Sequence, residues 1–172
     1  IADWHFAKGF DSAFGRMGKM MVSATAAIYR QCVKKLLPTP SKSHYLFNLR
    51  DFSRVVQGVL LAPASSMKET DKLVRLWTHE AYRVFYDRLV DDSDREIFFN
   101  SRQETLKEHV KADFSKLFAH LASEPSKGPS DDDMRSLFFC NFMEPGADPR
   151  IYNEVTDMMV LRETAEEYLG EY

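Results

Sequence analysis

Arginine side chains carry the most evident chemistry in this sequence. They form three spots, which are Arg50 with Arg54, Arg75 alone, and Arg83 with Arg88. Guanidinium groups bind phosphate or carboxylate through paired hydrogen bonds. Arg50 differs from the others because it falls in the first turn of a helix that we expect to begin after Asn48, where backbone N–H groups also receive anions. Arg50 is therefore the candidate anion-binding residue. An exposed face of salt bridges is the simpler interpretation of Arg75, Arg83 and Arg88.

The motifs of familiar enzyme classes are absent from the sequence. There is no GxxxxGK[ST] or GxGxxG phosphate loop and no GxSxG nucleophile turn. His79-Glu80 begins like the zinc motif HExxH, but Arg83 takes the place of the second histidine, which excludes a zinc peptidase on that helix. The aspartates 131–133 lack the alternating oxygen ligands and the glycine of a calcium loop, so a solvated loop is the simpler interpretation. We expect no catalytic site and no metal site.

The first half of the chain predicts three helices that position these arginines. Apolar residues spaced by three or four indicate a helix from an Asp11 N-cap to a stop at Pro38. Asn48 and Asp51 form a capping box for a second helix, which ends at 62–64. A second capping box, Ser66 with Glu69, predicts a third helix to about Val90. Its polar face carries Arg75, His79, Glu80, Arg83, Asp87 and Arg88.

The second half is less regular. Capping boxes at Ser93 and Ser101 predict a short helix near 94–100 and a longer one near 102–122. Segment 123–133 is predicted to be a mobile surface loop because it is polar and contains proline and glycine. The apolar run 137–143 fits a strand or one buried helical turn. A last helix is expected to begin at Asp148, with Pro149 in its first turn.

The length of 172 residues fits one ordinary domain or two very small ones, and the composition favours helices. Phenylalanine is frequent (13) and glycine scarce (7), so we expect a mostly α fold with at most a short strand pair near 45–47 or 137–142. A net charge of −3 argues against a general binder of nucleic acid or of anionic membranes. Cys32 and Cys140 are expected to be buried free thiols in a reducing compartment. Both ends look cut, which predicts a piece of a longer protein.

Two long segments resemble one protein family. Residues 37–54, LPTPSKSHYLFNLRDFSR, resemble the LPTPxKSHYxFNLRDxSR segment of dynein heavy chains in the axonemal form. Residues 76–89, LWTHEAYRVFYDRL, resemble the LWxHExxRVFxDRL helix of the same proteins at the expected separation. Residues 152–157 and 168–172 resemble the stretch that opens the next module of that family.

The resemblance implies an AAA+ small helical lid without a catalytic site of its own. It suggests that residues 1–122 are the lid region of the third module, that 123–133 is a loop, and that 134–172 lead into the fourth module. Arg50 matches the sensor-2 position, which faces the γ-phosphate of bound nucleotide. Arg54 would support it. His79, Glu80, Arg83, Asp87 and Arg88 would form a polar network between modules.

Cofactors and partners also follow from the resemblance. The whole protein would be an ATP-hydrolysing, minus-end-directed microtubule motor of the cytoplasm, cytoskeleton and ciliary axoneme, using ATP or ADP with magnesium. The isolated chain would hold no cofactor. Its partners would be the neighbouring AAA+ modules and, through the full-length protein, the microtubule and the dynein intermediate and light chains. Nucleic acid and membrane are not expected partners.

Two other functions are weighed against this one. An autonomous helical interaction module would dock a partner helix on the Trp77–Phe85 face and would expose a large apolar patch there. A self-sufficient enzyme is disfavoured by the missing nucleotide, metal and nucleophile motifs.

Overall fold

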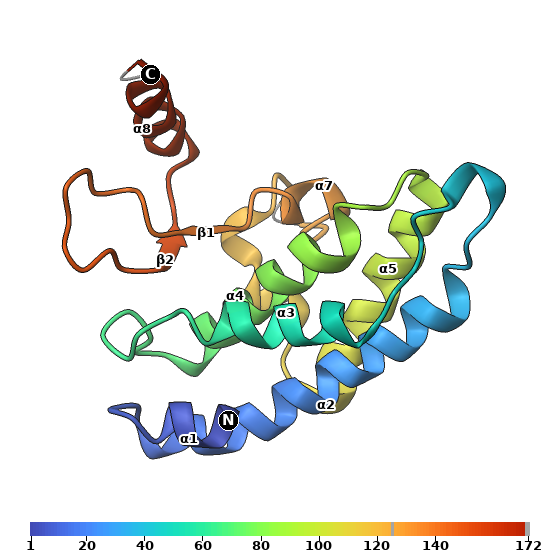
Figure 1. Cartoon of the computed structure of the whole chain (residues 1–172), viewed down its shortest axis with the longest axis horizontal. Coiled ribbons are helices and arrows are strands. Elements are labelled where there is room, and N and C mark those ends of the chain that lie inside the picture. Colours follow the sequence, from blue (N-terminus) through green and yellow to red (C-terminus); the bar gives the residue numbers. More distant parts are fainter. Residues whose placement is uncertain (125, 171–172) are drawn as a thin grey trace.

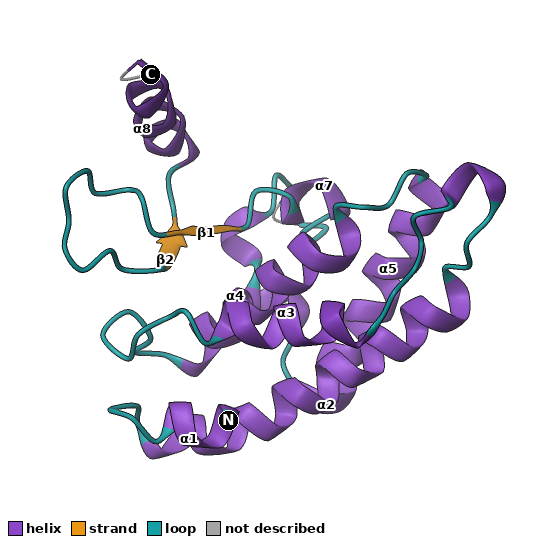
Figure 2. Cartoon of the chain, in the orientation of Figure 1, coloured by secondary structure: helices purple, strands orange, loops and turns teal. Residues whose placement is uncertain are grey.

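The computed structural model describes residues 1–124 and 126–170. The fold is mostly helical with one two-stranded sheet, as predicted (Figures 1 and 2). The α-helices are α1 (Ala2–Phe6), α2 (Ser12–Lys35), α3 (Leu49–Val59), α4 (Thr70–Ala81), α5 (Asp92–Thr105), α6 (Phe114–Leu117), α7 (Asp131–Met134) and α8 (Met158–Gly170). Single 3-10 turns lie at Pro40–Lys42 and Ala119–Leu121, π turns at Tyr82–Tyr86 and Leu106–Val110, and strands at β1 (Phe138–Cys140) and β2 (Asn153–Val155).

Helix α2 is the long element on which the other helices pack. The Asp11 carboxylate accepts the N–H of Ala13, which confirms the predicted N-cap. The predicted apolar stripe is buried from Phe14 to Cys32, and helices α3, α4 and α5 lie against it. Cys32 and Cys140 are both free and buried, as expected. Among the described residues no helix combines the length and the apolar character needed to cross a bilayer.

Helix α4 lies in the centre of the helical core. Every residue from Leu73 to Ala81 is buried except Arg75, which is half-buried. The Trp77 indole is 1% exposed and donates Nε1–H to the Thr25 hydroxyl of α2 over 2.9 Å. Trp4, on α1, is instead 64% exposed. The Trp77–Phe85 face proposed above as a docking surface is therefore part of the core and is not available to a partner.

The helix starts predicted at Ser66 and Ser101 are wrong, because neither serine caps a helix. The Ser66 hydroxyl donates to the Pro63 carbonyl within a turn, and α4 begins only at Thr70. Ser101 lies inside α5, which runs unbroken from Asp92 to Thr105 instead of as two helices. Burial of one continuous face, including Phe98 and Ser101, overrides the local capping pattern. The predicted extension to 122 is also interrupted, where Lys111 adopts a left-handed conformation (φ 57°).

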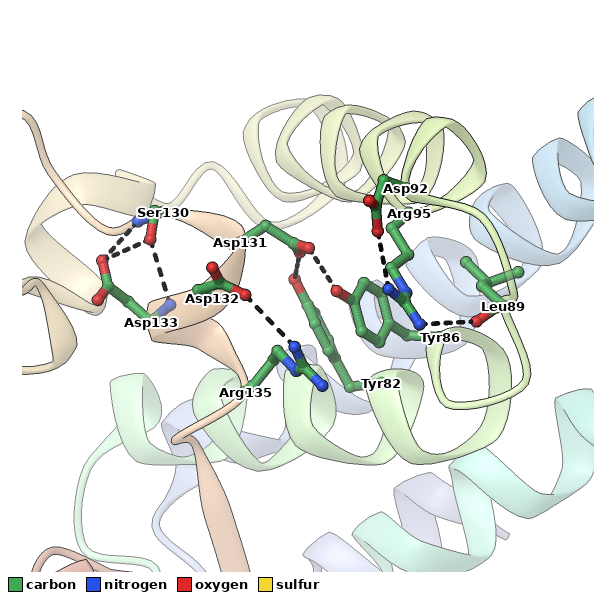
Figure 3. Close-up of polar contacts among 10 residues, drawn as sticks. All are labelled: Tyr82, Tyr86, Leu89, Asp92, Arg95, Ser130, Asp131, Asp132, Asp133 and Arg135. Atoms are coloured by element: carbon green, nitrogen blue, oxygen red, sulfur yellow. Dashed lines mark hydrogen bonds and ion pairs between the residues drawn. The ribbon is translucent and has the colours of Figure 1, made fainter.

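The aspartates of segment 123–133 are packed against the core rather than solvated throughout. Ser130 is the N-cap of α7, and the Asp133 carboxylate completes the capping box by accepting the Ser130 N–H. Asp133 also accepts hydrogen bonds from Ser123, and these contacts lower the pKa of its carboxyl to about 2. Asp131 accepts the hydroxyls of Tyr82 and Tyr86, whereas Asp132 pairs with Arg135 over 3.4 Å (Figure 3). The Asp132 side chain is exposed. The prediction of a loop through residue 133 is therefore wrong over its last residues, where tertiary partners form a helical turn.

The C-terminal segment forms a hairpin followed by a helix. Strand β1 pairs antiparallel with β2, and Phe139 lies opposite Glu154. The predicted helix at Asp148 is wrong, because residues 153–155 pair with β1 and α8 begins at Met158. The Asp157 carboxylate accepts the N–H groups of Met159 and Val160 and so caps α8. Figure 1 shows α8 projecting from the hairpin, away from the helical core.

A buried arginine lies inside an aromatic cage next to this core. Arg102 is 0% exposed, and none of its guanidinium nitrogens has a hydrogen-bond partner among the described residues. Its guanidinium carbon lies 4.5–5.7 Å from four ring centres, those of Tyr82, Phe99, Phe114 and Phe118. Burial lowers the pKa of Arg102, so desolvation outweighs the attraction of nearby groups.

We expect Arg102→Met to raise the free energy of unfolding by about 1 kcal/mol or more. The thioether fills the cage and contacts the rings without the cost of a buried, unpaired cation. Urea denaturation of the 172-residue chain measures this effect, with Arg102→Lys as the matched variant that keeps the charge and is expected to destabilise. A loss of more than about 2 kcal/mol in the methionine variant would instead show that the cation–π contacts dominate.

Candidate functional site

Arg50 lies where the sequence placed it, in the first turn of a capped helix. The Asn48 side chain accepts the Arg50 N–H over 2.8 Å, and the Asp51 carboxylate accepts the Asn48 N–H over 3.0 Å. The Arg50 side chain is exposed, and its guanidinium forms no ion pair with any part of the chain that the structure describes. It is therefore free to bind an anion that approaches the start of α3.

The charged neighbours of Arg50 are occupied with each other. Asp51 is 3% exposed, and its carboxylate accepts the Arg88 guanidinium over 2.9 Å. Arg88 also stacks over the Phe47 ring at 5.1 Å. Arg54 is exposed and reaches Asp51 only at 3.9 Å, a weak surface pair. Asp51 and Arg88 thus fix the start of α3, while Arg50 and Arg54 face solvent.

The connector before α3 is anchored by its own polar side chains. Lys42 pairs with both Asp91 and Asp94 at the start of α5. The Tyr45 hydroxyl donates to Asp94 and accepts the Val90 N–H, each over 2.9 Å. These contacts hold the 38–48 segment against the loop that precedes α5. Lys42 and Tyr45 therefore help to position α3.

The predicted polar network of α4 and its π turn is not one network. Arg83 pairs with Asp87 over 3.1 Å on the surface, and Arg88 pairs with Asp51. His79 and Glu80 are buried and face the C-terminal segment instead. The five residues therefore divide into a surface pair, a helix anchor and a pair that contacts the hairpin.

Four side chains of α4 bind the C-terminal hairpin and the residue before it. Arg75 donates two hydrogen bonds to Glu154, over 2.8 and 2.9 Å. Glu80 accepts the Tyr152 hydroxyl over 2.6 Å, and His79 Nδ1 lies 3.0 Å from the Leu137 carbonyl. Lys72 adds a contact with Asn153 over 2.7 Å. We call this set the hairpin clamp.

Sequence reasoning did not assign Arg75 or Tyr152 to this contact. The available signal was the spacing of Lys72, Arg75 and His79, which places three polar side chains on one helix face. Their partners lie about 80 residues further along the chain, so no local pattern could have identified them.

Burial shifts the pKa values of His79 and Glu80, the two central residues of the hairpin clamp. It lowers the pKa of His79 to about 4, so the ring is neutral at pH 7. Because a carbonyl only accepts, the neutral ring carries its proton on Nδ1 and donates it to Leu137. Burial raises the pKa of Glu80, and the hydrogen bond from Tyr152 opposes that shift. Within the described residues, no three His, Cys, Asp or Glu side chains gather as a metal site would require.

We expect the hairpin clamp to weaken in acid. The pKa of His79 is about 6.5 unfolded and about 4 folded, so its contribution is complete above pH 6.5 and is lost as the pH falls toward 4. The full loss is roughly 3 kcal/mol. Urea denaturation between pH 7 and 4 measures it.

His79→Gln is the control, since its amide still donates to Leu137 and does not titrate in this range. The difference between the two chains isolates His79. Equal pH dependence of the two chains would contradict its role.

The residues described above also resemble known proteins in sequence. A sequence model described as the AAA+ lid domain matches residues 21–119, the part that contains α3, α4 and α5. Dynein axonemal heavy chain 3 of Homo sapiens is 53% identical over 172 residues, covering 100% of this chain and 4% of that protein.

Two further relatives are similar along most of the chain. Dynein axonemal heavy chain 12 of Homo sapiens is 40% identical over 158 residues, covering 91% of this chain and 5% of that protein. Dynein axonemal heavy chain 2 of Homo sapiens is 37% identical over 163 residues, covering 95% of this chain and 3% of that protein. This chain thus spans only a small part of the relatives it matches. The resemblance to axonemal dynein heavy chains is confirmed, and the chain belongs to the AAA+ lid domain family.

Proposed function

We propose that this chain is the helical lid of the third AAA+ module of an axonemal dynein heavy chain, followed by the start of the fourth module. Residues 1–122 are the lid region, 123–133 the connection and 134–172 the lead-in. The chain itself is non-catalytic. The family match and the full-length similarity to axonemal heavy chains support this assignment.

Arg50 is the nucleotide-sensing residue in this proposal. The observation that carries it is an exposed guanidinium at a capped helix start that has no ion-pair partner among the described residues, while Asp51 and Arg88 beside it are paired with each other. A γ-phosphate offers Arg50 a charge-assisted hydrogen bond that a diphosphate does not offer. The lid therefore has two states of different energy, separated by about 1–3 kcal/mol according to the nucleotide. Arg54, one turn later, adds positive charge to the same approach.

The contacts described above supply a route for the shift of the lid. Helix α3 packs on α4, and α4 holds Glu154 and Tyr152 of the hairpin segment. The hairpin continues directly into α8. A movement of α3 that follows the nucleotide is thereby passed to the start of the next module.

In the whole heavy chain this relay would regulate ATP-driven, minus-end-directed movement on microtubules. The cofactor there is ATP or ADP with magnesium. The partners are the neighbouring AAA+ modules, the microtubule and the dynein intermediate and light chains. The place of action is the axoneme of cilia, within the cytoskeleton and cytoplasm.

We expect the isolated 172-residue chain not to bind ATP. Its sequence has no phosphate loop, so Arg50 alone supplies too few contacts for a stable complex. Titration with a fluorescent ATP analogue and magnesium, up to about millimolar concentration, measures this. A dissociation constant above that range corresponds to a binding free energy too small for a specific nucleotide site. Tight, saturable binding would contradict a lid without its own phosphate loop.

Arg50→Ala is expected to reduce the preference of the third site for ATP over ADP by about 10- to 100-fold. The variant loses only the hydrogen bond to the γ-phosphate, a contact made by charged groups. The measurement is the ratio of the two dissociation constants in a heavy chain that carries this segment and has its other nucleotide sites inactivated.

Arg16→Ala is the matched control, since Arg16 is also exposed in the first turns of a capped helix. Arg50→Lys tests whether charge alone is sufficient. An unchanged ratio in a folded Arg50→Ala protein would refute the sensing role.

A further inference from the structure

The Glu80 carboxylate lies where three separate elements meet. Glu80 belongs to α4, and its Oε1 accepts the Tyr152 hydroxyl from the segment that leads into β2. Its other oxygen packs against the backbone of Gly58 on α3. One buried side chain therefore contacts the helix that carries Arg50 and the segment that leads to α8.

Gly58 makes this arrangement possible. A Cβ built on Gly58 would overlap the carboxylate and the side-chain carbons of Glu80. Gly58 is buried in the last turns of α3, where alanine would otherwise give a more stable helix. Its φ angle is ordinary, so backbone conformation does not require glycine here. Space for Glu80 is the reason for glycine at this position.

The groups that face Glu80 are few. They are the Tyr152 hydroxyl, which donates to it, and the Arg83 guanidinium, which lies near enough to favour its charged form. Arg83 Nε is buried without a partner among the described residues, and Cys140 is close enough to Tyr152 to affect its pKa. No second carboxylate competes for the Tyr152 hydroxyl in the hydrogen bonds of the described chain. The joint therefore combines the hydrogen bond from Tyr152 with the close packing of Gly58.

We propose that Gly58, Glu80 and Tyr152 form the joint that couples the sensing helix α3 to the C-terminal hairpin, with Gly58 as its positioning residue. Any shift of α3 along its axis moves the Gly58 backbone against the carboxylate, which moves Tyr152 in turn. This proposal rests on the proposed function in one respect, which is that nucleotide sensing by Arg50 supplies the movement of α3. The contact itself requires no nucleotide.

Amide hydrogen exchange on the 172-residue chain tests the joint. Gly58→Ala displaces Glu80, so the β1 and β2 amides should exchange about tenfold faster while α2 stays protected. Tyr152→Phe removes only the hydroxyl and should have a similar effect. Gly15→Ala is the matched control, since nothing lies within 4 Å of a Cβ at Gly15. Unchanged exchange in both Gly58→Ala and Tyr152→Phe would overturn the proposal.

A double-mutant cycle separates the joint from simple loss of stability. In a Glu80→Ala background the added methyl at Gly58 meets no carboxylate, so Gly58→Ala should change hairpin exchange by less than about twofold. If Gly58→Ala alone unfolds the chain, the double variant should fold again. Additive effects, or a double variant that stays unfolded, would overturn the role of Gly58.

The titration of Glu80 provides a readout that a general packing defect would not move in this way. Tyr152→Phe removes a donor to the carboxylate and should raise the pKa of Glu80 further, whereas Gly15→Ala should leave it unchanged. Carboxyl carbon NMR of the two variants measures both. An unchanged pKa of Glu80 in Tyr152→Phe would contradict the hydrogen bond on which the joint depends.

The outcomes remain distinct from those of the sensing proposal. If Arg50 does not sense nucleotide, the exchange cycle on the isolated chain still shows the coupling. If the cycle fails while Arg50→Ala changes the ATP preference, the sensor is correct and the connection runs elsewhere.

Discussion

Burial of α4 from Leu73 to Ala81 is the constraint on which the rest of the structure depends. The buried polar side chains of this stretch are shielded from water, so they require hydrogen-bond partners within the protein. Trp77 finds Thr25 on α2, and His79 and Glu80 find Leu137 and Tyr152. The hairpin is thus held because α4 needs acceptors and donors on that side, not because two short strands are stable alone.

The same requirement explains why Arg50, at the start of α3, has no ion-pair partner in the described part of the chain. Lys42, Tyr45 and Asp51 are all satisfied within the chain, through Asp94, Val90 and Arg88. Through these contacts, the polar side chains of this segment hold it in place. Arg50 is left outside them, in the first turn of a helix whose capping residues are held in place. Rigid placement of an exposed cation is what a phosphate-sensing contact needs, because little ordering remains to be done when the anion arrives.

Sequence reasoning succeeded where information was local. The Asp11 and Asn48 caps and the apolar stripe of α2 are encoded within a few residues, and each was confirmed. It failed where distant contacts compete with local patterns. Ser66 and Ser101 have capping spacing but bond or pack elsewhere. Residues 153–155 form a strand with β1 rather than the predicted helix. The contacts that hold them, such as Glu154 with Arg75, join residues far apart in the sequence and arise only on folding. The position of Arg50 was predictable, but the division of the polar face of α4 was not.

The two tryptophans give this fold a built-in optical signature. Trp77 is enclosed at the centre of the core, where its indole N–H is bound to Thr25, whereas Trp4 stands in solvent with the Lys8 ammonium 3.5 Å above its ring. A water-soluble quencher such as iodide should therefore suppress one emission and spare the other. The blue-shifted, protected component belongs to α4 alone. Fluorescence can thus follow the central helix without any label, separately from the end of the chain.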